Sequence, residues 1–149
     1  MPDGLDDLYQ EIILDHYKRP RHKGALAQAD LHAEGFNPFC GDEVNLTLSL
    51  DADGRIDGVG FLGQGCSISQ ASASMLADHL TGLTLEEAEE LVRTFKGMMA
   101  GEHPSEEREE ELGDIVSLSG VTEFPIRIKC ALLGYTTLQD AIASYRRRP

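Results

Sequence analysis

The sequence predicts an α+β fold in which an antiparallel hairpin, extended by one short strand to a three-stranded sheet, is combined with several helices. Alternation of apolar and polar residues between positions 44 and 61 is typical of half-buried strands. Apolar residues at helical spacing fill much of the remaining chain. With 149 residues, 41% hydrophobic and 26% charged, the composition is that of one ordinary globular domain, so we expect residues 1–149 to form a single domain.

The first predicted element is an amphipathic helix close to the N-terminus. Its apolar residues recur at helical spacing, and they are Leu5, Leu8, Tyr9, Ile12, Ile13 and Tyr17. Asp6 and Asp7 lie near its start, where carboxylates interact favourably with the helix dipole. We expect this helix to end before Pro20, since proline interrupts helical hydrogen bonding.

The hairpin is predicted from residue 44 onward. Val44, Leu46, Leu48 and Leu50 alternate with polar residues and share one face of the first strand. Residues 51–54 form the turn, and the second strand carries Ile56, Val59 and Phe61. A short strand around residues 34–37 extends this sheet.

Three helical segments follow the hairpin. Residues 67–80 are rich in alanine and serine, which allow close packing, and Gly82 marks the stop. Thr84 and Glu87 form a capping-box pattern that opens a helix ending near Gly97. The last helix is expected over residues 127–145, with an interruption near residues 134–137.

An acidic stretch over residues 101–113 separates the last two of these helices. It has few apolar residues, and Pro104 precedes five glutamates, which are Glu106, Glu107, Glu109, Glu110 and Glu111. We interpret it as an exposed, partly helical excursion, because a run of like charges is usually a solvated face.

The overall charge restricts the classes of partner. The 26 acidic and 13 basic residues give a formal net charge of -13, which disfavours binding to nucleic acid and to membrane phosphates. No apolar run is long enough to span a membrane and the N-terminus does not resemble a signal peptide, so we expect a cytoplasmic protein. Basic clusters at residues 18–23 and 146–148 either dock an acidic partner or are solvated tails.

The three cysteines, Cys40, Cys66 and Cys130, are the main candidates for chemistry. An odd number of thiols in a reducing compartment is poorly explained by disulfides, which leaves metal binding or catalysis. Their spacing contains no CxxC signature and is weak evidence alone, so their neighbours carry the argument. Cys40 lies in a turn-forming sequence before the first strong strand, and Asp42 can face the same ligand if Gly41 takes an irregular conformation.

The other two cysteines are also expected at the ends of elements. Cys66 lies between the second hairpin strand and a helix, so antiparallel pairing brings it close to Cys40, and the helix N-terminus favours its thiolate. Cys130 is expected to open the last helix, with Arg127 and Lys129 adding positive charge. Each cysteine alone is more often a small buried hydrophobic residue, but three such positions together favour one site.

The donor set formed by these residues suits a soft or borderline cation. Three thiolates and one carboxylate, from Cys40, Cys66, Cys130 and Asp42, are the ligands that zinc accepts in tetrahedral geometry. Three thiolates with a replaceable fourth ligand can equally hold an iron–sulfur cluster. We expect a solvated or packing role for all five histidines, which are His16, His22, His32, His79 and His103.

The chain resembles the IscU/SufU/NifU-type proteins of iron–sulfur cluster assembly, and within them the SufU branch. The resemblance covers most of the chain and rests on Tyr9 to Tyr17, Arg19 to Gly24, Asn37-Pro38, Cys40-Gly41-Asp42, Gly63 to Ser69 and Arg127 to Cys130. It implies a small three-stranded antiparallel sheet with helices packed on one face. It further implies that Cys40, Asp42, Cys66 and Cys130 are a ligand set, which in SufU-like proteins holds zinc.

The same resemblance implies a function and partners. Cys40 matches the residue that accepts persulfide sulfur, which implies a pyridoxal-phosphate cysteine desulfurase as donor and other assembly proteins or apo-proteins as acceptors. Lys129 stands where IscU-type scaffolds have histidine, and the chaperone-recognition motif is missing around residues 123–127. Residues 97–121 look like the extra segment typical of SufU.

Three functions therefore follow as expectations. The first is a zinc-dependent sulfurtransferase that passes persulfide sulfur onward, and the alternative is a scaffold that assembles and transfers a transient iron–sulfur cluster. The third is a structural zinc domain, whose metal only closes the fold.

Overall fold

The computed structural model describes residues 7–148, and the side chains of its first helix from Tyr9 onward. This helix, α1, spans Asp7–Lys18 and ends before Pro20, as the sequence predicts. Ile13 and His16 are buried on its inner face. The sequence also assigns Leu5, Asp6 and the side chains of Asp7 and Leu8 to this helix. These lie outside the described part of the structure.

The sheet has three antiparallel strands in the order β1-β2-β3. They span Leu31–Asn37, Asp42–Leu50 and Ile56–Gln64. β1 is longer than the predicted strand, because all seven of its residues pair with β2, from Leu31 opposite Leu48 to Asn37 opposite Asp42. The alternation that would reveal its first half from sequence is weak, since Ala33 and Gly35 are small residues on the side that faces the helices.

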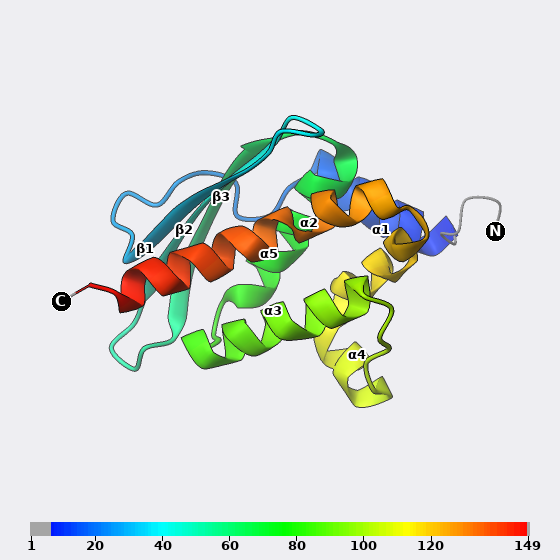
Figure 1. Ribbon diagram of the computed structural model, residues 1–149. Helices are drawn as coiled ribbons and strands as arrows, with labels where there is room; N and C mark the ends of the chain where they lie inside the picture. Colours follow the sequence, from blue (N-terminus) through cyan, green and yellow to red (C-terminus); the bar gives the residue numbers. More distant parts are fainter. Residues whose placement is uncertain (1–6, 149) are drawn as a thin grey trace.

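The helices pack against one face of this sheet (Figure 1), which confirms the predicted α+β fold. They are α2 at Ser67–Leu80, α3 at Leu85–Met99, α4 at Glu106–Leu112 and α5 at Pro125–Arg146. A 3-10 segment, η1, spans Gly113–Glu123. Thr84 caps α3 through the predicted capping box with Glu87. Within the described part of the chain, none of the helices combines the length and the apolar character that crossing a bilayer requires.

The predicted interruption of the last helix is wrong, because α5 continues through residues 134–137. Gly134 lies against Ala73 of α2, so the absence of a side chain serves close helix packing rather than a break. The Thr137 hydroxyl donates to the Leu133 carbonyl within the helix at 2.8 Å. α3 also continues two residues beyond Gly97.

Gly35 fixes the distance between α5 and β1. A Cβ atom at this position would overlap the Thr137 hydroxyl, so only glycine lets the helix lie this close to the strand. Because the same strand ends at Asn37, just before the Cys40 turn, this contact sets how the turn lies relative to α5.

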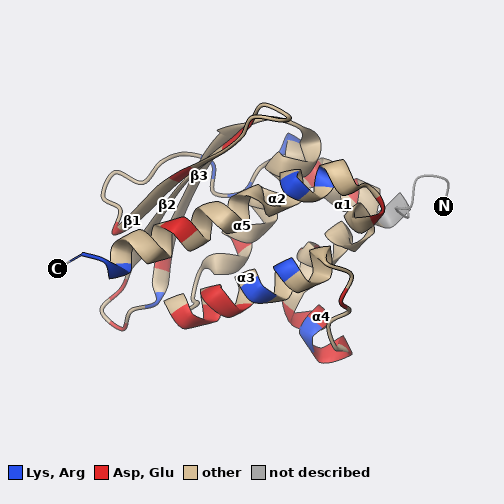
Figure 2. Ribbon diagram, in the orientation of Figure 1, with Lys and Arg blue, Asp and Glu red and all other residues tan. Residues whose placement is uncertain are grey.

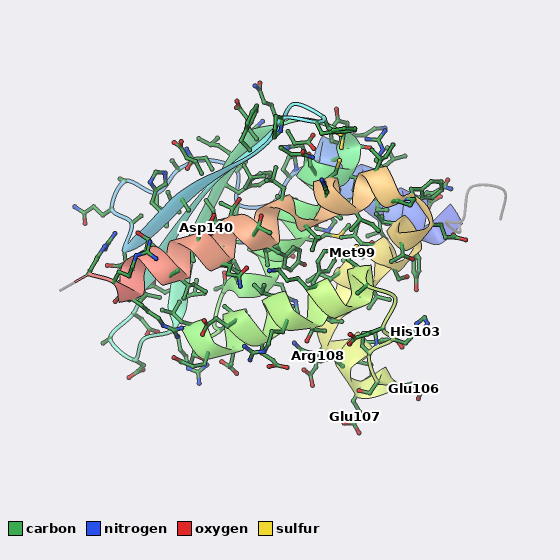
Figure 3. All side chains as sticks on the ribbon, in the orientation of Figure 1. Met99, His103, Glu106, Glu107, Arg108 and Asp140 are labelled. Atoms are coloured by element: carbon green, nitrogen blue, oxygen red, sulfur yellow. The ribbon has the colours of Figure 1, made fainter. Side chains whose placement is uncertain are left out.

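The acidic stretch is exposed along α4, as predicted, and Glu106 and Glu107 project away from the body of the molecule (Figure 3). The chain then returns to the core. Leu112, Ile115 and Leu118 are all buried at the end of α4 and along η1. Only the glutamate-rich part of this region is therefore an excursion.

The C-terminal basic cluster makes contacts within the chain. The guanidinium of Arg146 lies 3.0 Å from a carboxylate oxygen of Glu86 and 2.7 Å from one of Glu89. Arg148 donates to the Asp30 carbonyl at 2.7 Å and lies over the Tyr145 ring. Arg146 and Arg148 thus fasten the end of α5 to its neighbours, although all three arginines of the cluster are exposed.

Candidate metal centre

Three segments that are distant in sequence meet at one end of the sheet (Figure 1). They are the turn between β1 and β2, the first turn of α2 and the first turns of α5. Cys40 lies in the turn, Cys66 immediately before α2 and Cys130 in the second turn of α5.

Cys40, Asp42 and Cys130 form a close group of donor atoms. One ligand atom from each lies within 4.8 Å of the other two, and the two sulfur atoms are 3.5 Å apart. Asp42 and Cys130 are buried, whereas Cys40 is half-buried. Gly41, with a φ of 71°, takes the left-handed conformation that lets the chain turn between Cys40 and Asp42.

Cys66 borders this group without belonging to it in the structure. It is the N-cap residue of α2, where its sulfur accepts a hydrogen bond from the Ser69 amide at 3.5 Å. Its own amide donates to Asp42 Oδ1 at 2.9 Å. The predicted helix N-terminus is therefore present, and the pairing of β2 with β3 brings Cys66 beside Asp42.

Asp42 is held as a carboxylate. Burial acts to raise its pKa, but hydrogen bonds from the Cys66 amide and from the side chains of Cys130, Ser69 and Asn37 outweigh it, so the pKa lies below its ordinary value. A fully buried negative charge thus lies within the group of thiols. Such a charge is stabilised further by a cation.

Cys130 is not at a helix N-terminus, which corrects the prediction. α5 begins at Pro125, so Cys130 is its sixth residue, and its thiol lies 4.0 Å from the Ile126 carbonyl of the preceding turn. Burial raises the pKa of this thiol well above its ordinary value, and its contacts with Cys40, Asp42 and Cys66 act in the same direction. A metal that binds here must displace the proton of Cys130.

Arg127 supplies positive charge on the α2 side of the site. The pKa of Arg127 lies above its ordinary value, mainly because of its electrostatic interaction with Cys66 and, to a smaller extent, because of its contact with Cys130. Lys129 is exposed on the same turn of α5. Figure 2 shows this basic start of α5 together with acidic residues along α3 and α4 and elsewhere on the molecule.

Sequence reasoning missed the residues that support Asp42. Asn37 is buried at the end of β1, and its amide donates to Asp42 Oδ2 at 3.2 Å and lies 3.9 Å from the Cys130 sulfur. Gly65 has a φ of 146°, and a Cβ atom there would overlap the Asp42 carboxylate. A polar residue at a strand end and a glycine beside a cysteine were the available signals for these two roles.

The histidines lie apart from the close group of donors. His16, which is buried, lies 2.8 Å from the Ser74 hydroxyl and 2.9 Å from Asp114 Oδ2, and so joins α1 to α2 and η1. His32 lies 3.0 Å from the Asn45 side-chain oxygen on the sheet. In the part of the chain that the structure describes, this group contains thiols and a carboxylate alone.

The sequence and the fold have characterised relatives. The chain is 43% identical over 140 residues to the zinc-dependent sulfurtransferase SufU of Bacillus subtilis, with 94% of this chain and 92% of that protein covered. It is 42% identical over 139 residues to the iron–sulfur cluster assembly scaffold protein IscU of Streptococcus pyogenes, with 93% and 84% covered. The crystal structure of FiSufU from Fervidobacterium islandicum, described as an iron–sulfur cluster assembly scaffold protein for the SUF system, superimposes with a TM-score of 0.81 at 37% identity, covering 89% of this chain and 94% of that chain.

A family model described as the NifU-like N-terminal domain matches residues 8–131. The matched residues include the turn with Cys40 and Asp42, the α2 N-cap Cys66 and the buried Cys130. The chain therefore belongs to the family of NifU-like N-terminal domains.

Proposed function

We propose that this protein is a zinc-dependent sulfurtransferase of iron–sulfur cluster assembly, in which Cys40 accepts persulfide sulfur from a cysteine desulfurase and the sulfur is passed on to other assembly proteins or apo-proteins. The observation that supports it best is the close group formed by Cys40, Asp42 and Cys130. A half-buried thiol next to two buried donors combines access for a partner with donor atoms that are close enough to hold one metal ion.

The donor set fits zinc. Ligand atoms at about 2.3 Å from one tetrahedral ion lie roughly 3.5–4 Å apart, and the 3.5 Å between the sulfurs of Cys40 and Cys130 is within that range. Asp42 would add an oxygen ligand. Cys66, which follows Gly65 in the chain, would be the fourth ligand. When bound, zinc would hold the thiols as thiolates at neutral pH.

The residues of the chain account for the transfer itself. The sulfur of Cys40, as thiolate, attacks the terminal sulfur of the desulfurase persulfide, so a new sulfur–sulfur bond forms on Cys40 while the donor's bond breaks and its cysteine leaves as thiolate. Phe39, 74% exposed, places this turn at the surface where a partner can reach it. The guanidinium of Arg127 is close enough to the thiols to stabilise anionic sulfur.

Sulfur transfer of this kind suits a cytoplasmic protein, because thiols stay reduced there between transfers. The partner that this function needs is a pyridoxal-phosphate cysteine desulfurase. Lys129 is consistent with this function, because a lysine ammonium in place of an imidazole removes a ligand that a cluster scaffold would use.

The test combines metal analysis with a desulfurase assay. Purified protein should contain one zinc per chain and should stimulate cysteine turnover by a desulfurase, and Cys40→Ala should lower sulfur acceptance at least about 100-fold because the attacking group is gone. Circular dichroism should show an unchanged fold, since Cys40 lies in a turn and is only half-buried. Equal activity of Cys40→Ala and the wild-type protein would refute the proposal.

A scaffold function is the second candidate, supported by the 42% identity to the Streptococcus pyogenes IscU scaffold. Anaerobic reconstitution with iron and sulfide separates the two. A coloured cluster that transfers to an apo-protein supports the scaffold, whereas zinc that iron does not replace supports the sulfurtransferase. A structural zinc domain would instead unfold when a chelator removes the metal.

A further inference from the structure

The face of the sheet that points away from the helices is divided into two halves. Strand register places Glu34 and Phe36 of β1 on this face, together with their partners Asn45 and Glu43 on β2. On β3 the matching positions run from Gln64 and Leu62 to two glycines, Gly60 and Gly58.

The chain itself covers the glycine half. The connection from α1 pairs with the outer edge of β3, where the Gly24 amide donates to the Phe61 carbonyl at 2.9 Å. It then crosses onto the face, and the Leu26 amide donates to the Thr47 hydroxyl at 3.1 Å. A Cβ atom at Gly60 would meet this segment, so the glycines let the connection press against the sheet.

The other half, next to the Cys40 turn, is uncovered. It forms a shallow groove of about 680 Å³, lined among others by Phe36, Asn45 and Leu62. Phe36 is 59% exposed and Leu62 is 39% exposed, although both lie in regular strands. Large exposed apolar side chains on a sheet face indicate an interaction surface.

The charge of this groove is negative. Its two charged lining residues are Glu34 and Glu43, on neighbouring strands. Their side-chain hydrogen bonds come from neutral amides, from Asn45 to Glu34 at 3.3 Å and from Gln64 to Glu43 at 3.3 Å. Glu34 also lies 4.0 Å from the His32 imidazole, but its side chain is 71% exposed. Glu34 and Glu43, which is also exposed, can therefore still pair with an incoming cation, while a second copy of a chain with a net charge of -13 would be repelled.

We propose that this groove is the docking site for a partner protein that inserts an apolar side chain flanked by lysine or arginine residues. Phe36 and Leu62 provide the apolar contact, and Glu34 and Glu43 pair with the flanking cations. On the helical side, by contrast, the metal site is bordered by the cation Arg127. The acidic groove thus suits a basic partner, and the helical side with Arg127 suits an acidic one. Docking in the groove does not depend on sulfur transfer.

The experiment uses a blocked peptide, Gly-Lys-Lys-Phe-Lys-Lys-Gly, titrated into the ¹⁵N-labelled full chain. We expect amide shift changes to concentrate on residues 34–36, 43–45 and 62–64. The double variant Glu34→Gln/Glu43→Gln should weaken binding about 3- to 10-fold, and Phe36→Ser should weaken it similarly, because each removes one part of the recognition.

Two controls make the result specific. Glu106→Gln/Glu107→Gln removes the same charge from the projecting end of α4 and should leave the affinity unchanged (Figure 3). A peptide with glutamate in place of lysine, or glycine in place of phenylalanine, should not bind in the groove. The proposal is wrong if the shifts map to α3 and α4, if both double variants behave alike, or if sedimentation shows that Phe36→Ser abolishes a dimer of the chain.

Discussion

The end of the molecule that holds the candidate metal site, here called the metal-site end, and the contact between α3 and α5 bury polar atoms in opposite ways. At the metal-site end, Asp42 and Asn37 are buried and bonded to each other and to their neighbours. At the α3–α5 contact, Phe95 and Tyr135 stack with their ring centroids 4.0 Å apart, and the buried Tyr135 hydroxyl has no hydrogen-bond partner among the described residues.

This difference separates two uses of burial. Polar groups at the metal-site end satisfy one another and hold a charge in place, so their stability cost is offset locally. The hydroxyl in the α3–α5 contact carries a desolvation cost with no compensating bond. Substitutions should therefore lower both stability and metal binding at the first region, and improve stability at the second.

The largest effect is expected for Gly65→Ala. The new Cβ atom would overlap the Asp42 carboxylate and force a positive φ on a residue that disfavours it, so we expect a loss of about 2–4 kcal/mol in the free energy of unfolding and weaker zinc binding. Urea unfolding and a zinc competition titration measure these. Gly82→Ala is the matched control, because its φ is also positive, at 93°, and its Cβ would meet no atom within 4 Å. Equal effects of the two variants would show that the overlap with Asp42 is unimportant.

An intermediate effect is expected for Asp42→Asn, with a defined pH dependence. The folded state lowers the pKa of Asp42 below its ordinary value of 3.8, so the carboxylate stabilises the fold above about pH 4 and this contribution is lost as the pH falls through the lower, folded pKa. The difference in unfolding free energy between metal-free wild type and variant should shrink from pH 6 toward pH 3. Asp53→Asn, in the exposed β2–β3 turn, is the control. A difference that stays constant over this range would contradict the prediction.

A smaller effect, of opposite sign, is expected for Tyr135→Phe. Removing the unpaired hydroxyl while keeping the ring that stacks on Phe95 should stabilise the chain by about 1 kcal/mol and raise its Tm by a few degrees. Thermal unfolding followed by circular dichroism measures this, with zinc content unchanged. A lower Tm would mean that the hydroxyl has a partner, such as a buried water.

The smallest effect is expected for Glu106→Gln/Glu107→Gln in α4. Both side chains project into solvent, so the free energy of unfolding should change by less than about 0.5 kcal/mol and sulfur acceptance should not change (Figure 3). A clear loss of sulfur acceptance would make the acidic end of α4 part of the partner surface.

Much of the fold follows from local patterns. The alternation around Val44 and Phe61 and the capping box at Thr84 predict the hairpin and α3 because these signals depend on neighbouring residues alone. The continuity of α5 could not be predicted in this way. Gly134 weakens a helix by itself, and only the contact with Ala73 of a different helix shows why it is there.

The candidate site could be predicted from the sequence about as far as the fold could. Cys40 and Cys66 were expected to approach because hairpin pairing is local. In the structure Asp42 contacts both regions, since it belongs to the close donor group with Cys40 and accepts a hydrogen bond from the Cys66 amide. The role of Cys130 depends on how α5 lies over β1, through Gly35 and Thr137, which sequence periodicity does not specify. For the same reason Asn37, whose partner Cys130 is 93 positions away, went unrecognised.

Because α5 is continuous, metal binding at Cys130 should affect the stability of the whole molecule. Cys130 lies in its second turn, and the following four turns of the same helix pack on β1, β2, α2 and α3. A metal ion bound to Cys130 would therefore restrain α5, the helix against which these elements pack. Hydrogen exchange should consequently slow upon zinc binding along α5 and α2, including their ends distant from the thiols, while the projecting α4 keeps its rate.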